Sequence, residues 1–393
     1  MPAMSATGIS MTWTDRFFAW RDRVVASPTF QRWAAAFPLT RPIARRQASQ
    51  LFDLVAGFVY SQVLLACVRL RVFEILAEGP QSVTTLAHRL DLSENSAQRL
   101  LAAASSLGLL AQRSDGRFAL GQLGAVMVGN RAVAAMVEHH ASVYMDLADP
   151  VALLRRDSPT RLSDYWAYAG DEGSERARSL RAEQVADYSA LMSASQPLVA
   201  DQIIDAYPLG RHRCLLDVGG GEGTFLSHVA RRVPGLQLKL FDLPAVAERG
   251  RLRFEAQGIA HRASAHGGSF FDDPLPVGAD IVSLVRVIYD HDDEHALKIL
   301  RAVRAALPDG GTLILAEPMA GTPGAEAMGD AYFGFYLLAM GKGEARTPAQ
   351  LSALLSLAGF GSVRVLPTHL PLQTRVIVAR PLAVNTASHE AQP

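Results

Sequence analysis

The sequence is short of cysteine, of net charge and of long uncharged apolar runs. Its 393 residues include only two cysteines, Cys67 and Cys214, which lie far apart in apolar surroundings. This excludes a disulfide or zinc-ligand framework and is typical of small core residues in a reducing compartment. Lys plus Arg and Asp plus Glu both total 38, so no global electric field would attract nucleic acid or acidic partners.

Signals for export and membrane insertion are also lacking. The N-terminal residues contain no apolar core of a signal peptide. The most apolar stretch, residues 51–73, is interrupted by Asp53, Gln62, Arg69 and Arg71. It falls short of the roughly 18 uncharged residues that a membrane-spanning helix needs. We therefore predict a cytoplasmic protein, with one reservation about its N-terminal segment.

That segment, taken as a helical arm over residues 1–48, is rich in arginine and aromatic residues. Trp13, Phe17, Trp20 and Val24 recur at helical spacing and share one face of the predicted helix. Such a helix packs against its own protein or a dimer mate, or lies in a membrane interface. The pattern leaves both open, so peripheral contact with the inner membrane is one of the two expectations.

Residues 49–130 have the pattern of a winged-helix module. Two short helices separated by a turn, the second beginning after Ser93, precede two alternating segments that meet at Asp115-Gly116, a dipeptide suited to a tight hairpin. A DNA-reading module of this type would carry several basic or amide side chains on its second helix, and this module is not basic. We predict a dimerisation domain without nucleic-acid binding. A ligand-sensing regulator is the alternative.

The remaining chain is predicted to form a helical segment followed by an α/β domain. Residues 131–210 read as a linker and pocket segment, in which "YWAYAG" and "DYSALMSASQP" supply wall residues. From residue 211 to 382 strands such as "RCLLDVGGG", "LQLKLFDLP" and "GGTLILAEP" alternate with helices. Alternation of this kind predicts a Rossmann-like, doubly wound sheet that binds ligands at the carboxyl ends of its strands. Residues 383–393 are expected to be a disordered tail.

A glycine-rich turn and an aspartate give this domain a candidate nucleoside site. Gly219, Gly220, Gly221 and Gly223 lie between a strand and a helix, where glycines permit a sharp turn and a close ligand approach. Asp242 ends the next strand, where a carboxylate can bind both hydroxyls of a ribose. Because no P-loop lysine follows, a nucleoside without pyrophosphate, such as S-adenosylmethionine, is favoured.

The motifs of the C-terminal domain resemble those of a known family. "LLDVGGGEGTF", "FDLP", "GGSFF", "DHDDEHALKIL", "ALPDGGTLILAEP" and "GKGEART", in this order over residues 213–380, resemble the S-adenosylmethionine-dependent O-methyltransferases of the plant caffeate and flavonoid type and their bacterial relatives. Residues 50–125 resemble the dimerisation domain of that family. The N-terminal third is most similar to purple-bacterial members that act in carotenoid synthesis. The resemblance implies a homodimer that methylates the hydroxyl of an apolar small molecule, with a hydroxylated carotenoid as the expected acceptor.

The resemblance also assigns roles around the cofactor. Residues 219–221 would line its methionine part and Asp242 would bind its ribose. The adenine would contact Leu243, Ser269 and Phe270, where Ser269 replaces an aspartate common in the family. The further cofactor-binding candidates are Asp217 and Arg286.

In "RVIYDHDDEH" the catalytic histidine of the family is missing. Tyr289 stands at its position, and His291 stands where the family has tryptophan. One of these side chains removes the acceptor's proton, or alignment of oxygen, methyl and sulfur supplies most of the rate, which we favour. Metal binding is a third interpretation, but residues 292–294 are explained by capping of the next helix, so we predict no metal. Glu317 and Glu344 complete the predicted catalytic set, as orienting carboxylates.

The acceptor is indicated by an aromatic stretch near the C-terminus and by the missing histidine. "MGDAYFGFYLLAMGKG" could line an apolar cavity for a long polyene, as could a plain core helix. A tertiary alcohol is a very weak acid that histidine would deprotonate poorly, so the missing histidine agrees with a non-phenolic substrate. Another apolar, phenolic or tetrapyrrole pigment acceptor is the alternative.

Overall fold

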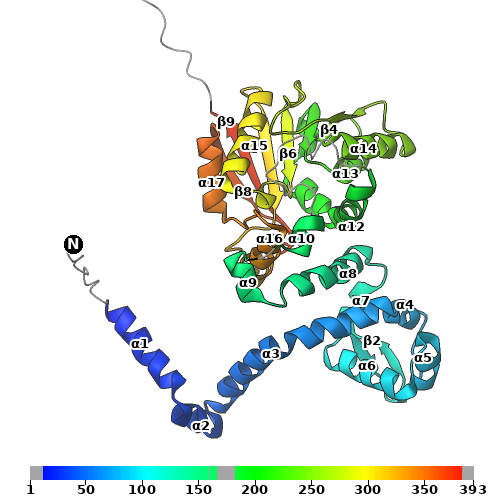
Figure 1. Ribbon diagram of the computed structural model, residues 1–393, viewed down its shortest axis with the longest axis vertical. Helices are drawn as coiled ribbons and strands as arrows, with labels where there is room; N and C mark the ends of the chain where they lie inside the picture. Colours follow the sequence, from blue (N-terminus) through cyan, green and yellow to red (C-terminus); the bar gives the residue numbers. More distant parts are fainter. Residues whose placement is uncertain (1–11, 158, 166–181, 383–393) are drawn as a thin grey trace, which may run out of the picture. The chain divides into compact units, whose positions relative to one another are not determined.

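The computed structural model describes residues 12–157, 159–165 and 182–382, and its chain divides into two compact units at Val128 and Gly129. The N-terminal unit contains the arm and the winged-helix module. The C-terminal unit contains the large sheet (Figure 1). The predicted tail, residues 383–393, lies outside the described residues.

The arm consists of three helices, α1 (Trp13–Ala26), α2 (Pro28–Ala36) and the first part of α3 (Arg41–Arg69). Thr12 caps α1 in a reciprocal pair with Asp15, and the Ser27 hydroxyl accepts from the Phe30 N–H at the start of α2. Caps of this kind satisfy N–H groups that have no partner within the helix.

The long helix α3 is the segment of the chain that bears on membrane insertion. It spans 29 residues and contains an 18-residue window of mean hydropathy 1.9 with at most two charged side chains. The reason is that Asp53 and Arg69 lie near the two ends of the apolar run. By length and composition, α3 is the one helix in the described ranges that could cross a membrane, a test that core helices also pass. Near its C-terminal end Leu65 and Cys67 are buried within the N-terminal unit.

The winged-helix module forms as predicted. Its helices are α4 (Val72–Ala77), α5 (Val83–Leu90), α6 (Glu94–Ser106) and α7 (Gln122–Met127), and its hairpin is β1 (Leu110–Gln112) with β2 (Phe118–Leu120). The Ser93 hydroxyl caps α6, and Gly116 supplies the positive φ of 82° in the hairpin turn. Both cysteines of the chain, Cys67 and Cys214, are free and buried, as expected.

Among the described residues of the C-terminal unit, the helices that precede the sheet are α8 (Arg131–Asp146), α9 (Pro150–Arg155), α10 (Arg161–Tyr165) and α12 (Ala182–Ala206). Most of the predicted wall segment "YWAYAG" lies outside the described residues. The second predicted wall segment lies in α12, where Met192 and Ser193 do line the main cavity.

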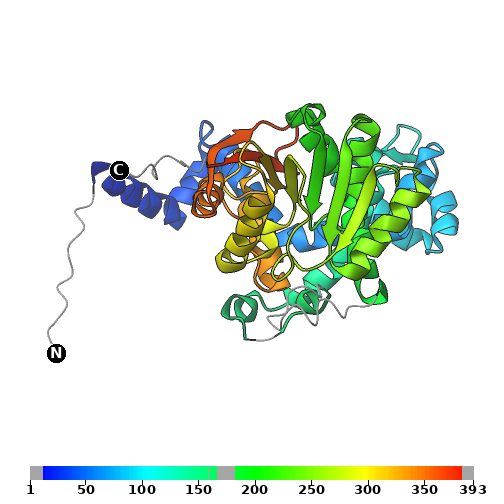
Figure 2. The same cartoon turned by 90° about the horizontal axis from the view of Figure 1, so that it is seen from above.

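The sheet, visible in Figures 1 and 2, has seven strands in the order β5-β4-β3-β6-β7-β9-β8. Neighbouring strands from β5 to β7 are parallel, and β9 alone runs in the opposite direction, antiparallel to both β7 and β8. The strands are β3 (Cys214–Val218), β4 (Gln237–Asp242), β5 (Ala263–Gly267), β6 (Ile281–Val285), β7 (Thr312–Glu317), β8 (Phe360–Leu366) and β9 (Arg375–Pro381). All but β5 were predicted. The sequence "ASAHG" of β5 escapes recognition because this edge strand has no run of large apolar residues.

Helices cover both faces of the sheet. On one face Leu215 of β3 packs in a core with residues of α12, α13 (Thr224–Arg232) and α14 (Pro244–Ala256). On the other face Leu216 packs with residues of α15 (Asp293–Ala306) and α17 (Pro348–Leu357). Successive strand residues alternate between the two faces, so a fully buried parallel strand reads as a continuous apolar run.

The strand order places a ligand site at the carboxyl end of β3. The chain proceeds from β3 to β4 and β5 on one side and then crosses to β6 on the other. At such a reversal the two neighbouring connections leave in opposite directions and open a crevice. The glycine turn after β3, Asp242 after β4 and the segment after β6 therefore converge.

Candidate active site

The glycine turn between β3 and α13 is shaped by steric requirements. Gly219 and Gly221 have φ angles of 67° and 59°, in the left-handed region that favours glycine. Gly220 is required for a different reason, since a Cβ there would lie 2.3 Å from the Asp217 Oδ2 atom and 2.6 Å from the Leu240 side chain. The turn therefore presents bare backbone to the crevice.

Asp242, at the end of β4, is fixed by two backbone donors. Its Oδ2 accepts from the Gly221 N–H and its Oδ1 from the Leu243 N–H, each at 2.8 Å. Burial raises the pKa of Asp242 to about 6, and these two hydrogen bonds oppose that rise. The glycine turn and the strand end that carries the acid are thus tied to each other.

Asp217 lies behind the turn rather than in the cavity. It is fully buried, its Oδ1 accepts a 2.6 Å hydrogen bond from the Ser283 hydroxyl, and its Oδ2 has no hydrogen-bond partner among the described residues. Burial raises the pKa of Asp217 to about 7, with the nearby Asp242 charge adding to the rise. Its place under Gly220 suits support of the turn better than direct ligand contact.

A cavity of about 1030 Å³, part of it open solvent, occupies the crevice. The predicted cofactor-binding residues that line this cavity are Gly219, Gly220, Gly221, Asp242, Leu243, Ser269, Phe270 and Arg286. Ser269 is buried and accepts weakly from the Phe271 N–H at 3.3 Å. The structure therefore brings together all the predicted cofactor-binding side chains except Asp217.

Arg286 follows β6 in a left-handed backbone conformation with φ of 57°, which is unusual for a residue with a side chain. Its guanidinium donates to the Ser195 hydroxyl at 2.8 Å, to the Met192 carbonyl at 3.1 Å and to the Gln196 side chain. These contacts fix a cation at the wall of the cavity.

The short helical turn η2 (Ile288–Asp290) carries Tyr289 and Asp290, and both are buried. The Tyr289 N–H donates to Glu317 Oε2 at 3.1 Å. Burial and the Asp290 charge hold the pKa of Tyr289 well above its usual value. Burial also raises the pKa of Glu317 to about 8, against the hydrogen bond from Tyr289. Asp290 itself lines the cavity.

His291 lies at the aromatic side of the cavity. Its ring makes edge contacts with Phe270 and Phe271, with centroid distances of 5.7 and 5.5 Å. Burial and the neighbouring His295 lower the pKa of His291 to about 3, so the ring is neutral. His291 thus occupies the tryptophan position of the family as a packing side chain beside the predicted adenine end.

The acidic stretch that follows caps a helix, as predicted. Asp292 is the N-cap of α15, and its Oδ1 accepts from the His295 N–H at 3.0 Å and contacts the His295 ring at 2.7 Å. Asp293 pairs with Arg346, which is almost fully buried and donates to the carbonyls of Ile288 and His291. No metal-binding group of three or more His, Cys, Asp or Glu occurs in the ranges that the structure describes.

Glu344 does not reach the buried cluster with its side chain. It is exposed, and only its N–H is engaged, by the Tyr289 carbonyl at 2.8 Å. The aromatic stretch before it forms the π-helix η3 (Ala327–Phe333) and then α16 (Gly334–Met340), where one regular helix was expected. Widened turns of this type are frequent at functional sites.

An aromatic cluster forms next to Tyr289. Its buried members include Tyr336, Leu337 and Met340, and Phe333 contacts the Tyr289 ring edge-on at 6.0 Å. Two histidines of α8 contact tyrosine hydroxyls of this cluster. The His139 ring contacts the Tyr336 hydroxyl at 3.0 Å and His140 that of Tyr332 at 2.8 Å. The cluster is therefore mostly apolar, and its tyrosine hydroxyls contact histidine rings.

Sequence reasoning missed several of these residues. Asp290 was read only as part of an acidic stretch, although it directly follows the tyrosine that replaces the catalytic histidine. Arg346 and the adjacent pair His139-His140 carried no motif. Their roles arise from contacts with segments more than 50 residues away. Arg346 contacts residues 288–293, and the two histidines of α8 contact residues 327–340.

The chain belongs to the O-methyltransferase family. The model of the O-methyltransferase domain matches residues 144–361, and the model of the O-methyltransferase dimerisation domain matches residues 52–130. The protein is thus an S-adenosylmethionine-dependent O-methyltransferase, and its dimerisation domain supports the predicted homodimer. This settles the class of the protein in favour of an enzyme rather than a regulator.

Two curated relatives share a specific activity. Demethylspheroidene O-methyltransferase of Cereibacter sphaeroides is 44% identical over 357 residues, covering 91% of this chain and 93% of the relative. The enzyme of the same name from Rhodobacter capsulatus is 40% identical and covers 91% and 88%. Acetylserotonin O-methyltransferase of Mus musculus is 31% identical and covers 81% and 85%.

Solved structures agree on the fold. The SAH-bound form of CalO1, a methyltransferase in calicheamicin biosynthesis, is 26% identical with a TM-score of 0.69, covering 86% of this chain and 98% of that one. Human N-acetylserotonin methyltransferase in complex with SAM is 24% identical with a TM-score of 0.71, covering 86% and 98%, and shows the fold alone.

Proposed function

We propose that this enzyme transfers the methyl group of S-adenosylmethionine to the hydroxyl of a carotenoid of the demethylspheroidene or hydroxyneurosporene type. The observation that carries the proposal is the 44% identity to a demethylspheroidene O-methyltransferase over 91% of the chain. The apolar aromatic cluster around Tyr289 supports it, because a polyene needs an apolar site. Tyr289 in place of the family histidine agrees with an acceptor that is a weaker acid than a phenol.

In this proposal the cavity holds the cofactor as follows. The bare backbone of residues 219–221 faces the methionine part and Arg286 its carboxylate. Asp242 binds the ribose hydroxyls, and Leu243 and Phe270 enclose the adenine. When bound, S-adenosylmethionine supplies an electrophilic methyl group on a sulfonium, and the residues of the chain bind and orient this cofactor. Asp217 supports the turn from below.

A turnover assay tests the acceptor. The full-length protein would be incubated with methyl-labelled S-adenosylmethionine and demethylspheroidene, and the product analysed by mass spectrometry. We expect a labelled product heavier by one methylene. Phenolic and tetrapyrrole acceptors would be run in parallel, and faster turnover of either would overturn the carotenoid assignment while leaving the methyltransferase class intact.

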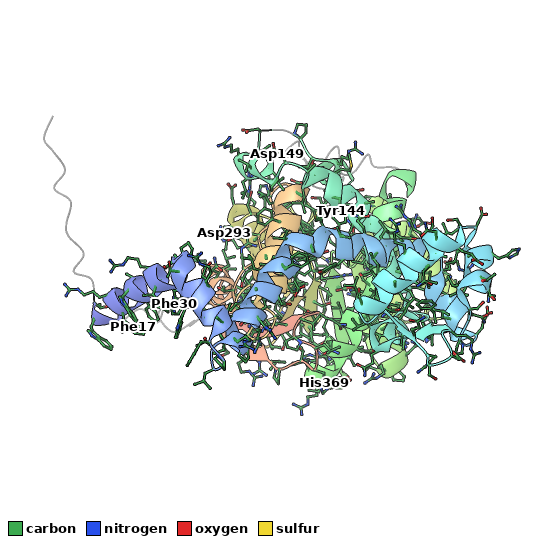
Figure 3. The ribbon with its side chains drawn as sticks, turned by 90° about the horizontal axis from the view of Figure 1, so that it is seen from below. Phe17, Phe30, Tyr144, Asp149, Asp293 and His369 are labelled. Atoms are coloured by element: carbon green, nitrogen blue, oxygen red, sulfur yellow. The ribbon has the colours of Figure 1, made fainter. Side chains whose placement is uncertain are left out.

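We further propose that the arm binds the anionic cytoplasmic face of a membrane, where such an acceptor would be dissolved. Residues 12–50 contain seven arginines, no lysine and two aspartates, so their net charge is positive. The aromatic side chains of the arm are exposed except for the half-buried Phe30, with Trp13 at 79% and Trp20 at 55% (Figure 3, where Phe17 and Phe30 are labelled). Arginine with exposed aromatics suits an anionic lipid interface.

Vesicle sedimentation tests the membrane proposal. The full chain should sediment with vesicles that contain anionic lipid and less with purely zwitterionic ones, and Trp20→Ser should weaken this binding. Leu252→Ser is the matched control, since Leu252 is 51% exposed on α14 in the other unit. If Trp20→Ser changes the dimer equilibrium but not sedimentation, the arm packs on a dimer mate instead.

A further inference from the structure

Orphaned polar atoms gather at one side of the cavity. In the described part of the chain, five buried side-chain N or O atoms lack a hydrogen-bond partner. Three of them belong to Arg286, Asp290 and Glu317, and a fourth belongs to Asp217 under the glycine turn. A buried polar atom without a partner is costly, so such a concentration marks a place where a polar ligand completes the hydrogen bonding.

Asp290 is the carboxylate of this group that reaches the ligand space. It is 6% exposed, its Oδ1 is unpaired, and it lines the cavity together with Gly219 and Arg286. Glu317 is fully buried and is absent from the cavity lining, and its Oε2 holds the Tyr289 N–H. Asp290 also directly follows Tyr289, a member of the aromatic cluster. It therefore lies at the cavity wall and is next in the chain to the cluster that is proposed to receive the acceptor.

We propose that the Asp290 carboxylate, rather than Tyr289 or His291, accepts the proton that the acceptor hydroxyl loses during methyl transfer. The inference goes beyond the identity of the acceptor and needs only that a hydroxyl be methylated. A lone pair of the hydroxyl oxygen forms the new O–C bond, and the breaking C–S bond leaves its electron pair on sulfur, which becomes neutral. The hydroxyl proton passes to Asp290, so charge and atoms balance.

The two alternative groups are poor acceptors for this proton. Tyr289 is buried and its pKa is held well above 10, so its hydroxyl stays protonated. His291 packs between Phe270 and Phe271, and its lowered pKa of about 3 makes the imidazole a weak base. A carboxylate that is buried and poorly solvated is a stronger base than an exposed one.

The charge on the cofactor prepares Asp290 for this role. Burial and the Glu317 charge raise the pKa of Asp290, and Arg286 lowers it. Tyr289 is the other ionisable group that interacts with Asp290. A sulfonium in the cavity adds a positive charge and favours the ionised carboxylate. Binding of S-adenosylmethionine should therefore release a proton, whereas the product S-adenosylhomocysteine, with neutral sulfur, should release less.

Calorimetry can measure the proton released on nucleoside binding when no methyl acceptor is present. The full-length enzyme would be titrated at pH 7 with each nucleoside in phosphate and in Tris, two buffers with different ionisation enthalpies. We expect the apparent binding enthalpy to depend on the buffer more for S-adenosylmethionine than for S-adenosylhomocysteine. Any proton linked to Asp242 is common to both ligands and cancels. In Asp290→Asn the difference should vanish.

Turnover rates test whether Asp290 accepts the proton during methyl transfer. With any hydroxyl acceptor that the enzyme methylates, Asp290→Asn should lower kcat by about 10²- to 10⁴-fold and remove the acidic limb of the kcat–pH profile. Glu317→Gln should keep the limb, because Glu317 is absent from the cavity lining. Asp272→Asn, at an exposed carboxylate outside the cavity, is the control.

Defined results would overturn the proposal. One such result is that Asp290→Asn keeps a kcat within tenfold of wild type and the same acidic limb of the kcat–pH profile. Another is that this limb is lost in His291→Ala instead. If the Asn variant does not fold, the wild-type comparison decides, and equal buffer dependence for the two nucleosides contradicts the proposal. Absence of turnover with carotenoids alone would refute only the acceptor assignment.

Discussion

Replacement of Asp242 by Asn gives the sharpest test of the cofactor site. Both Asp242 oxygens accept backbone N–H groups, from Gly221 and Leu243, at 2.8 Å. Each oxygen keeps further lone-pair capacity for a ribose hydroxyl. The Asn amide has only one carbonyl oxygen, and its NH₂ group would face a backbone donor. We therefore expect loss of ligand hydrogen bonds together with disturbance of the turn.

The size of the effect follows from the charge on the acceptor. Hydrogen bonds to a charged group contribute about 1.5–3 kcal/mol each, so two of them amount to about 3–6 kcal/mol. At about 1.4 kcal/mol per tenfold change, the Kd for S-adenosylhomocysteine should rise by about 10²- to 10⁴-fold. Isothermal titration measures this directly, and Asp272→Asn should leave the Kd unchanged. A Kd within threefold of wild type for Asp242→Asn would refute the assignment.

The pH dependence gives a second readout of Asp242. Because its folded-state pKa is raised from 3.8 to about 6, the folded protein binds more protons than the unfolded chain between these pH values. The free energy of unfolding should therefore fall as pH rises from about 4 to about 6 through this group. Ligand binding has the opposite trend, since the ribose needs the carboxylate, so nucleoside affinity should fall below about pH 6.

Three further predictions concern the turn and the loop after β6. Gly220→Ala should abolish nucleoside binding by titration and cost about 1–3 kcal/mol of stability through the clash at 2.3 Å, whereas Gly235→Ala, with open space around it, should do neither. Tyr289→Phe should keep kcat within tenfold in the turnover assay, because its buried hydroxyl does not ionise. Arg346→Met should lower the free energy of unfolding in urea by about 1–3 kcal/mol, since the carbonyls of Ile288 and His291 lose a buried donor, whereas the Asp293 carboxylate left behind is largely exposed. An Arg346→Met midpoint equal to that of wild type would contradict the last of these.

Much of the fold could be predicted because its signals are local. Buried parallel strands read as apolar runs, as in "CLLDV" of β3, and the caps Ser93 and Asp292 mark helix starts whatever the rest of the chain does. β5 was missed because an edge strand of small and polar residues has no such pattern. The π-helix at 327–333 was missed because its extra residue per turn is set by packing against other segments.

The convergence of the glycine turn and the acid on one cavity was also predictable. Glycines with positive φ and an acid at the end of a strand have narrow steric and chemical reasons to exist, so Gly219 and Asp242 could be placed at the same crevice from the sequence. The surroundings of Tyr289 could not. Glu344 was expected in the buried cluster, but its side chain is exposed, while Asp290 was passed over and is buried at the cavity wall.

The sequence by itself determined the order of elements, the glycine turn and the acid that follows the second strand, because each depends on the conformation of a few consecutive residues. Only the tertiary structure decided that Asp290 Oδ1 is buried without a hydrogen-bond partner among the described residues, that His291 packs on Phe270, and that Arg346 donates to the carbonyls of Ile288 and His291. The reason is that burial and electrostatic environment are properties of the neighbours, and these neighbours come from strands and loops that meet only when the sheet has formed.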